Sequence, residues 1–352
     1  MSIKEEFFGH TKEGLVVKIY KMTNKNGMEA HVINQGATLM RLYVADKNNQ
    51  FDDIVLGFDD LKSYEMNGPS FGASIGRNAN RIKDAKVMID GVVYQLEKND
   101  GENNLHGGGK GFGRVYYEAA TKEEEGKDSV IFCRVSPDME QGFPGTFTYQ
   151  ITYTLTDENE LIIHYEGTSD KDTIVNMTNH SYFNLKGHTS GNAMNHKLKI
   201  MASKFTGSDE GNVCNGSFVE VVGTPMDFRE YKELKKDIDA DFVPLKVSEG
   251  YDHNYILENK GDLTVKVADL LEESSGRHME VYTTAPGIQL YTTNSLELDE
   301  GCTYKDHAQY NERDAVCLET QNYPNACNIP AFPSPVLKAG EKYESTTIYK
   351  FV

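Results

Sequence analysis

The sequence predicts an all-β protein, built as one large antiparallel β-sandwich with few short helices. Short stretches of alternating apolar and polar residues recur along the chain between turn clusters, as is typical of antiparallel strands. Helical periodicity is rare, and no internal repeat, low-complexity tract or compositional break divides the 352 residues. We therefore expect a single domain over residues 1–352 rather than two domains.

The first half of the chain contains the predicted hairpins in close succession. Asp90-Gly91 joins two predicted strands, and this dipeptide tolerates the positive φ angles of a type I′ turn. Residues 147–155 alternate most regularly, with aromatic and aliphatic residues at odd positions. The charged residues 121–128 are expected to form a solvated hairpin tip. Strands are predicted over residues 15–20, 29–34, 38–44, 86–89, 92–96, 147–155 and 161–166.

The second half continues the same pattern, with strands predicted over residues 263–270, 280–284, 288–293, 316–321 and 343–351. Helical signals are limited to two places. Asp59-Asp60 is expected to cap a short turn through Leu61 and Tyr64. Asp227 is expected to cap a helix, because apolar residues follow it at nearly helical spacing. Those residues are Phe228, Tyr231, Leu234 and Ile238.

The composition excludes several classes of function. A net charge of −18 leaves no basic face for nucleic acid or for an anionic membrane surface. No stretch approaches 18 apolar residues, so we expect no membrane span. The five cysteines show no C-x-x-C spacing, which predicts reduced thiols and a cytoplasmic location. Tryptophan is absent, so a sugar ligand would have to stack on Phe or Tyr.

Two stretches carry candidate acid–base groups. The heptapeptide 179–185 surrounds His180, which ordinarily titrates near neutral pH, with amide, hydroxyl and aromatic side chains. Glu319 lies near the end of the predicted strand 316–321, where residues on both faces are expected to be buried. Burial raises the pKa of a carboxylic acid and makes its anion a better base. Taken alone, each residue also fits a purely structural role.

Three further stretches are rich in hydrogen-bonding groups. Residues 76–82 contain two arginines and two asparagines, which suit a polyhydroxylated ligand or merely balance surface carboxylates. Residues 103–112 place His106 before a glycine-rich run, but Gly111 follows Lys110 where a phosphate loop has Ser or Thr. Asp252, between aromatic and amide residues at 249–257, fits either a ligand contact or a simple turn.

Read together, these stretches resemble the aldose 1-epimerase, or galactose mutarotase, family over nearly the whole chain. Many ordered motifs are far more specific than any one of them. The stretches that carry the resemblance are residues 34–39, 55–58, 76–82, 104–108, 179–185, 223–229, 251–254, 286–292 and 318–321.

The resemblance implies a fold, an activity and a set of roles. The family's fold is a large antiparallel sandwich, and its activity interconverts the α and β anomers of free aldohexoses such as glucose and galactose. It implies that His180 is the general acid and Glu319 the general base, with His106 at the reacting centre. Sugar contacts are implied for Asn80, Arg81, Asp252 and Gln289. No metal, cofactor, nucleic acid or membrane partner is implied, and the chain is expected to be a monomer or homodimer.

Two departures from the family pattern, Met226 and Asn78, are expected to adjust sugar preference. Three other functions remain open at this stage. A non-catalytic sugar-binding sandwich would need no acid–base pair. A glycosidase would need two carboxylates at one glycosidic oxygen, and Asp252 and Glu319 are the candidates. A hexose-6-phosphate 1-epimerase would need more basic residues than Arg77 and Arg81.

Overall fold

Antiparallel strands dominate the chain, as the alternating pattern predicts. The structure, a computed structural model, describes residues 2–296 and 300–352. Within that range it contains two short α-helices, α1 (Leu61–Met66) and α2 (Val243–Val247). Neighbouring strands of its large sheets pair antiparallel. The all-β fold class with few short helices is therefore confirmed.

The largest sheet in the described part of the chain has nine strands and joins distant parts of the sequence. The C-terminal strand lies at its centre, between strands from the middle and the later part of the chain. In sheet order the strands are β11 (Glu118–Glu124), β12 (Lys127–Ser136), β13 (Phe147–Thr156), β14 (Glu160–Ser169), β28 (Lys342–Phe351), β24 (Arg277–Thr283), β23 (Ala268–Glu272), β18 (Lys197–Ile200) and β21 (Lys232–Glu233).

Two smaller sheets pack with it. The N-terminal sheet contains β1 (Ser2–His10), β2 (Val16–Thr23), β3 (Glu29–Ile33), β4 (Thr38–Ala45) and β5 (Phe51–Asp53). The sheet that carries Asp252, Gln289 and Glu319 runs in the order β17 (Tyr182–Phe183), β26 (Val316–Gln321), β25 (Gly287–Tyr291), β22 (Asp252–Ile256), β19 (Lys204–Ser208) and β20 (Cys214–Glu220).

Short two-stranded ladders complete the fold between these sheets. They pair β7 (Arg81–Ile82) with β10 (Asn104–Leu105), β6 (Ser74–Ile75) with β16 (Thr178–Asn179), β8 (Lys86–Ile89) with β9 (Val92–Gln95), and β15 (Thr173–Ile174) with β27 (Val336–Leu337).

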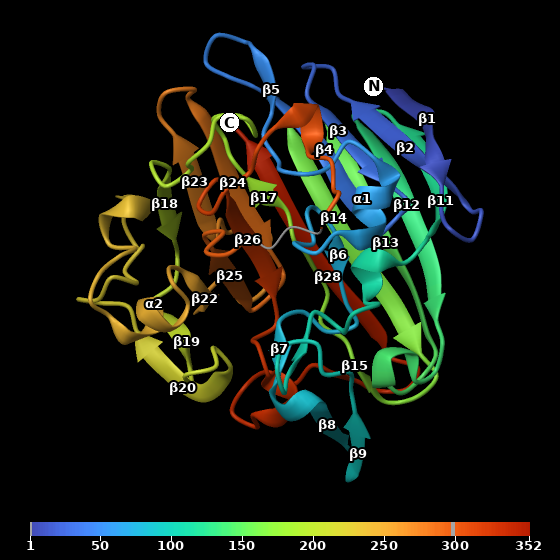
Figure 1. Cartoon of the computed structure of the whole chain (residues 1–352), viewed down its shortest axis with the longest axis vertical. Helices are drawn as coiled ribbons and strands as arrows, with labels where there is room; N and C mark the ends of the chain where they lie inside the picture. The colour runs from blue at the N-terminus through green and yellow to red at the C-terminus, as the bar shows by residue number, and fades with distance from the viewer. Residues whose placement is uncertain (1, 297–299) are drawn as a thin grey trace.

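The main core lies between the sheets. Figure 1 shows the blue strands β1–β4 in front of the long green strands β12–β14, with the red strand β28 beside them. Tyr20 of β2 meets Phe132 of β12 edge-to-face, with ring centroids 6.0 Å apart. One cluster of buried side chains includes both rings and also Leu290 and Leu318 of the third sheet. This continuity supports the single-domain prediction over residues 1–352, which stays a prediction.

Several local predictions are confirmed. In β13 the odd-numbered residues from Phe147 to Leu155 are buried, which matches the predicted alternation. Asp90 and Gly91 join β8 and β9 and both have positive φ, as a type I′ turn requires. The Asp60 carboxylate accepts a hydrogen bond from the Ser63 amide at 2.8 Å and caps α1.

The helix predicted after Asp227 is wrong. The Asp227 carboxylate instead accepts the amide of Arg229, two residues on, at 3.2 Å, which forms a tight turn. Lys232 and Glu233 then join the nine-stranded sheet as β21, and residues 234–236 form a single 3₁₀ turn. Phe228, Leu234 and Ile238 are buried as the helical spacing suggested, but from an irregular segment.

Other boundaries also differ from prediction. The strand predicted over 263–270 begins only at Ala268, because residues 259–265 form a hydrogen-bonded turn. The edge strand β1 and the helix α2 were not predicted, and β1 has a mostly exposed side-chain pattern. In residues 2–296 and 300–352, no helix is both long and apolar enough to cross a bilayer.

A buried ion pair ties residue 305 to the N-terminal sheet. The Lys305 ammonium lies 2.6 Å from the Asp53 carboxylate and 2.9 Å from the Met40 carbonyl oxygen. Lys305 is fully buried and Asp53 is 2% exposed. A charge buried this deeply depends on its partner, because water cannot replace the lost interaction.

We predict that Asp53→Asn, which keeps the side-chain shape but removes the charge, lowers the free energy of unfolding by about 3–5 kcal/mol. Urea denaturation measures this change. The control is Asp241→Asn, which removes the partner of Lys246 in an exposed ion pair, and it should leave stability unchanged. Equal stability of the two variants would contradict the importance of the buried pair.

Candidate active site

Six of the seven predicted site residues line one cleft of about 740 Å³, a volume suited to a small molecule. They are Asn80, Arg81, His106, His180, Asp252 and Glu319. The seventh, Gln289, lines a small adjoining cavity together with Asp252. Tyr182 and Tyr291 also line the cleft. Because the chain has no tryptophan, these tyrosines are the aromatic side chains on which a sugar could stack.

His180 is held by its backbone and its ring. It lies between β16 and β17, where its amide donates to the Ala73 carbonyl at 2.9 Å and its carbonyl accepts from the Gly72 amide at 3.0 Å. The ring stacks on Tyr182, with centroids 5.0 Å apart. Its Nδ1 lies 3.6 Å from the buried thiol of Cys317, so Nε2 is left to face the cleft.

Glu319 projects from β26, whose residues are all buried. The alternation of the strand places Cys317, Glu319 and Gln321 on the site face, while Leu318 on the opposite face joins the main core. The sequence prediction that both faces of this strand are buried is confirmed. Glu319 is 2% exposed, and its Oε2 atom has no hydrogen-bond partner within the described part of the chain.

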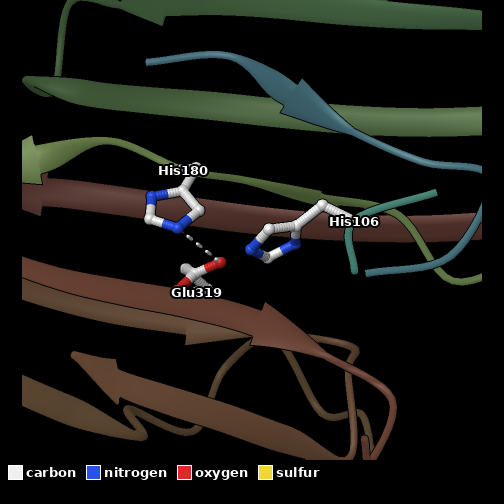
Figure 2. A group of neighbouring side chains, drawn as sticks. All are labelled: His106, His180 and Glu319. Carbon is white, nitrogen blue, oxygen red and sulfur yellow. Dashed lines mark ion pairs between the residues drawn. The ribbon is translucent and has the colours of Figure 1, made fainter. Parts of the chain in front are cut away.

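His180 and Glu319 form the centre of the cleft. His180 Nε2 lies 3.6 Å from Glu319 Oε2 (Figure 2). Burial lowers the pKa of His180 to about 4, with its own backbone carbonyl and Asp252 opposing the shift. Burial also raises the pKa of Glu319 well above its ordinary value, helped by Asp252 and opposed by Arg81. Burial therefore disfavours the charged form of both groups.

His106 completes the group shown in Figure 2, where one of its ring nitrogens points toward the Glu319 carboxylate. Its ring meets that of His180 edge-to-face, with centroids 5.2 Å apart. The backbone amide of Asn80 donates a hydrogen bond to His106 Nδ1 at 3.2 Å. The neutral ring therefore carries its proton on Nε2. Burial and the nearby His180, Arg81 and Arg114 hold the pKa of His106 well below its usual value. His106 thus presents a hydrogen-bond donor toward the Glu319 carboxylate.

The same three side chains place possible ligand atoms within 4.8 Å of one another, close enough to surround a metal ion. The tautomer of His106 opposes that use. A ring nitrogen that carries a proton cannot ligate a metal. Moving the proton from Nε2 to Nδ1 would make it face the N–H of the Asn80 backbone amide, so that two donors would meet. The hydrogen bonding therefore favours proton chemistry at this site, and the absence of a metal stays a prediction.

Arg81 and Asp252 form the polar side of the cleft. Arg81 donates through Nε to Asp100 at 2.8 Å, and its Nη1 lies 3.5 Å from Asp252 Oδ2. Asp252 Oδ1 accepts from Gln289 Nε2 at 2.6 Å. Gln289 is only 3% exposed, and the hydrogen bond that it donates orients the Asp252 carboxylate. Its predicted sugar contact stays a prediction.

The other residues singled out in the sequence lie away from the cleft. The Arg77 guanidinium is buried and donates to Pro144 and Gly145 carbonyls and to the Thr173 and Ser136 hydroxyls, which is a structural role. Asn78 and Met226 are buried, and neither is among the described residues that line the cleft. Their predicted effect on sugar preference would have to be indirect.

Sequence reasoning missed two residues of the site. Asp100 pairs with Arg81, and Asn212 Nδ2 donates to Asp252 Oδ2 at 2.7 Å. Both lie in polar turns, where Asp and Asn are common, so no local pattern separates them from other loop residues. Only their position beside the cleft marks them.

Comparison with protein families shows to which family the chain belongs. The family model described as aldose 1-epimerase matches residues 18–350. The galactose mutarotase of Sus scrofa is 39% identical over 100% of this chain and 99% of its own length. The chain belongs to the aldose 1-epimerase family. It is therefore an enzyme of the isomerase class, and the resemblance inferred from its motifs is confirmed.

Further relatives of this epimerase agree. The aldose 1-epimerase of Escherichia coli (strain K12) is 35% identical over 97% of this chain and 96% of its own length. The crystal structure of galactose 1-epimerase from Lactobacillus acidophilus NCFM is 26% identical, covers 100% of this chain and 99% of its own, and gives a TM-score of 0.86. A homologue from C. elegans is 29% identical with 99% of both chains covered and a TM-score of 0.85.

The hydrogen bonding of this epimerase predicts the proton positions on two histidines. At neutral pH His106 should carry its proton on Nε2 and His180 should be uncharged, because burial lowers the pKa of both rings. Long-range ¹H–¹⁵N NMR spectra distinguish protonated from unprotonated ring nitrogens. His106→Gln and His180→Asn each remove one ring and assign the signals. A doubly protonated ring at neutral pH would contradict the prediction.

Proposed function

We propose that this protein is a mutarotase, which interconverts the α and β anomers of free aldohexoses such as glucose and galactose in hexose and galactose metabolism. The observation that carries the proposal is the buried pair of His180 and Glu319, 3.6 Å apart in a cleft lined by groups suited to sugar hydroxyls. Membership of the aldose 1-epimerase family supports it.

The chemistry requires two coupled proton transfers. Opening the ring breaks the bond between C1 and the ring oxygen, so the C1 hydroxyl loses a proton while the ring oxygen gains one. Glu319 takes the first proton as general base, and His180 supplies the second as general acid. Each transfer by a positioned group contributes about 10²–10⁴-fold. The aldehyde then rotates about C1–C2 and closes on its other face with the roles reversed.

Proton counting connects this scheme to the buried pair. The two groups hold one proton between them throughout, on His180 before ring opening and on Glu319 after it. Burial lowers the pKa of His180 and raises that of Glu319, and so favours the uncharged pair. That pair accompanies the open aldehyde. Burial thus favours the net movement of one proton from His180 to Glu319 that ring opening requires.

Other groups hold the sugar during this exchange. His106 offers an Nε2 proton next to Glu319, suited to an oxygen at the reacting centre. Arg81, Asp252 and Asn80 supply charged and amide groups to the rest of the sugar. Fixing most of the sugar while C1 rotates keeps the aldehyde in the site.

The alternatives have less support. A sugar-binding protein without catalysis has no use for a carboxylic acid buried beside an imidazole. A hexose-6-phosphate epimerase needs cations for the phosphate, yet Arg77 is committed to backbone and hydroxyl acceptors outside the cleft. Arg114 lines the cleft, but it donates to the Gly109 carbonyl at 2.9 Å.

We propose a cytoplasmic location and a monomeric or homodimeric state. Cys214 and Cys317 are buried free thiols, which supports a reducing compartment.

Because several curated relatives are named galactose mutarotase, galactose is the first sugar to test.

The function is tested by polarimetry on freshly dissolved α-D-galactose and α-D-glucose. The protein should accelerate the approach to the equilibrium rotation, and no acceleration over buffer would contradict the proposal. His180→Asn and Glu319→Gln should each lower kcat by about 10²–10⁴-fold, since each removes one proton-transfer group. His164→Asn, on β14 outside the cleft, is the matched control and should keep wild-type kcat. Near wild-type turnover in either site variant would refute the role of that residue.

The pH dependence should show a wide plateau. Activity requires a single proton on the pair, and burial disfavours the charged form of both groups, which widens the range in which one proton is held. The acidic limb should lie near pH 4, where His180 becomes protonated and the pair then holds two protons. The alkaline limb should follow loss of the pair's last proton, which burial holds on Glu319 to higher pH. The ordinary pKa values of free glutamate and histidine would give the opposite assignment, with Glu319 on the acidic limb.

The kcat/KM profile from polarimetry measures this dependence, because it reports the free enzyme. An acidic limb near the ordinary histidine pKa of 6.5 would contradict the prediction.

A further inference from the structure

The Asp252 carboxylate is held from both sides of its strand. Strand β22 lies between β25 and β19 in the sheet. From β25, Gln289 Nε2 donates to Oδ1 at 2.6 Å. From the turn that follows β19, Asn212 Nδ2 donates to Oδ2 at 2.7 Å. One donor on each oxygen fixes the plane of the carboxylate, and the remaining lone pairs are left for other partners.

The turn that carries Asn212 is built to keep it in place. The Asp209 carboxylate accepts the amides of Gly211 and Val213 through Oδ1, at 3.0 and 3.1 Å. Its Oδ2 lies 3.2 Å from the ammonium of Lys83, two residues after Arg81. Asn212 has a φ of 56°, in the left-handed region that asparagine tolerates better than most residues. The turn is therefore anchored both to itself and to the segment that supplies Arg81.

Asn212 differs from Gln289 in facing the substrate space. Both residues line the small cavity beside Asp252, but Asn212 also lines the main cleft. It is closer to Asp252 than Arg81, whose Nη1 is 3.5 Å away. One amide group therefore touches both the carboxylate proposed to bind the sugar and the space that the sugar would occupy.

We propose that Asn212 is a positioning residue for sugar binding, which holds Asp252 in the orientation that receives sugar hydroxyls. This inference rests on the proposed function, because it assumes that the cleft binds a free sugar. Asn212 lies in a turn outside all of the stretches that carry the family resemblance.

The first test is Asn212→Gly, because glycine keeps the left-handed backbone of the turn while removing the amide. The variant should raise KM for galactose about tenfold or more, the usual effect of losing a hydrogen bond to a charged group. Its kcat should stay within about twofold of wild type, because His180 and Glu319 are untouched. Polarimetric rates over a range of galactose concentrations separate the two constants.

The second test is Asn212→Asp, which replaces the donor with a carboxylate of nearly the same shape. Repulsion from Asp252 should raise KM further than in Asn212→Gly. Lowering the pH from about 8 to about 5 should reduce this excess relative to wild type, because two close carboxylates then share a proton. A residue that only maintained the turn would give no such pH-dependent KM.

The matched control is Asn215→Gly in the same hairpin. Asn215 is exposed and donates to the Ser208 carbonyl at 3.1 Å rather than to a site residue. It should leave KM and kcat unchanged. If Asn212→Gly and Asn212→Asp both bind galactose with wild-type KM, or if Asn215→Gly raises KM equally, the inference is overturned. Failure of the wild-type protein itself to accelerate mutarotation would instead overturn the proposed function.

Discussion

The burial of the Glu319 carboxyl group beside His180 is the interaction on which the rest of the site depends. A carboxylate in water is a weak base, and a free imidazolium loses its proton above about pH 6.5. Burial in the cleft lowers the pKa of His180 and raises that of Glu319, so the charged form of each group is disfavoured. The enclosing sheets are what make that burial possible, since β26 is covered on both faces.

A second theme is that each functional group is held by a neighbour from another element. The His180 backbone is bonded to residues 72 and 73, the His106 ring to the Asn80 amide, and the Asp252 carboxylate to donors from two flanking elements. Because these contacts already orient the side chains, the side chains need not reorient during the proposed reaction. In the proposed mechanism the C1 end of the sugar moves, and these residues would form a fixed frame around it.

The agreement and disagreement between sequence and structure have physical causes. Residues 147–155 alternate because one face is packed in the core, so their strand was predictable. Strand β1 lies at a sheet edge with most side chains exposed, so its sequence carries no such alternation. After Asp227 the apolar spacing suggested a helix, but the Asp227 side chain caps a tight turn and the segment then joins a sheet. Tertiary pairing overrode local propensity there.

The sequence by itself determined the fold class, the family and the main candidates His180, Glu319, His106, Asn80, Arg81 and Asp252, because these lie in ordered motifs or in strands with a clear period. Only the tertiary structure decided that burial lowers the pKa of His180 and raises that of Glu319, that Arg77 serves the scaffold, and that Asn212 reaches Asp252. Desolvation and hydrogen bonding depend on distances between residues far apart in the chain, such as the 3.6 Å between His180 and Glu319, and no local pattern encodes such distances.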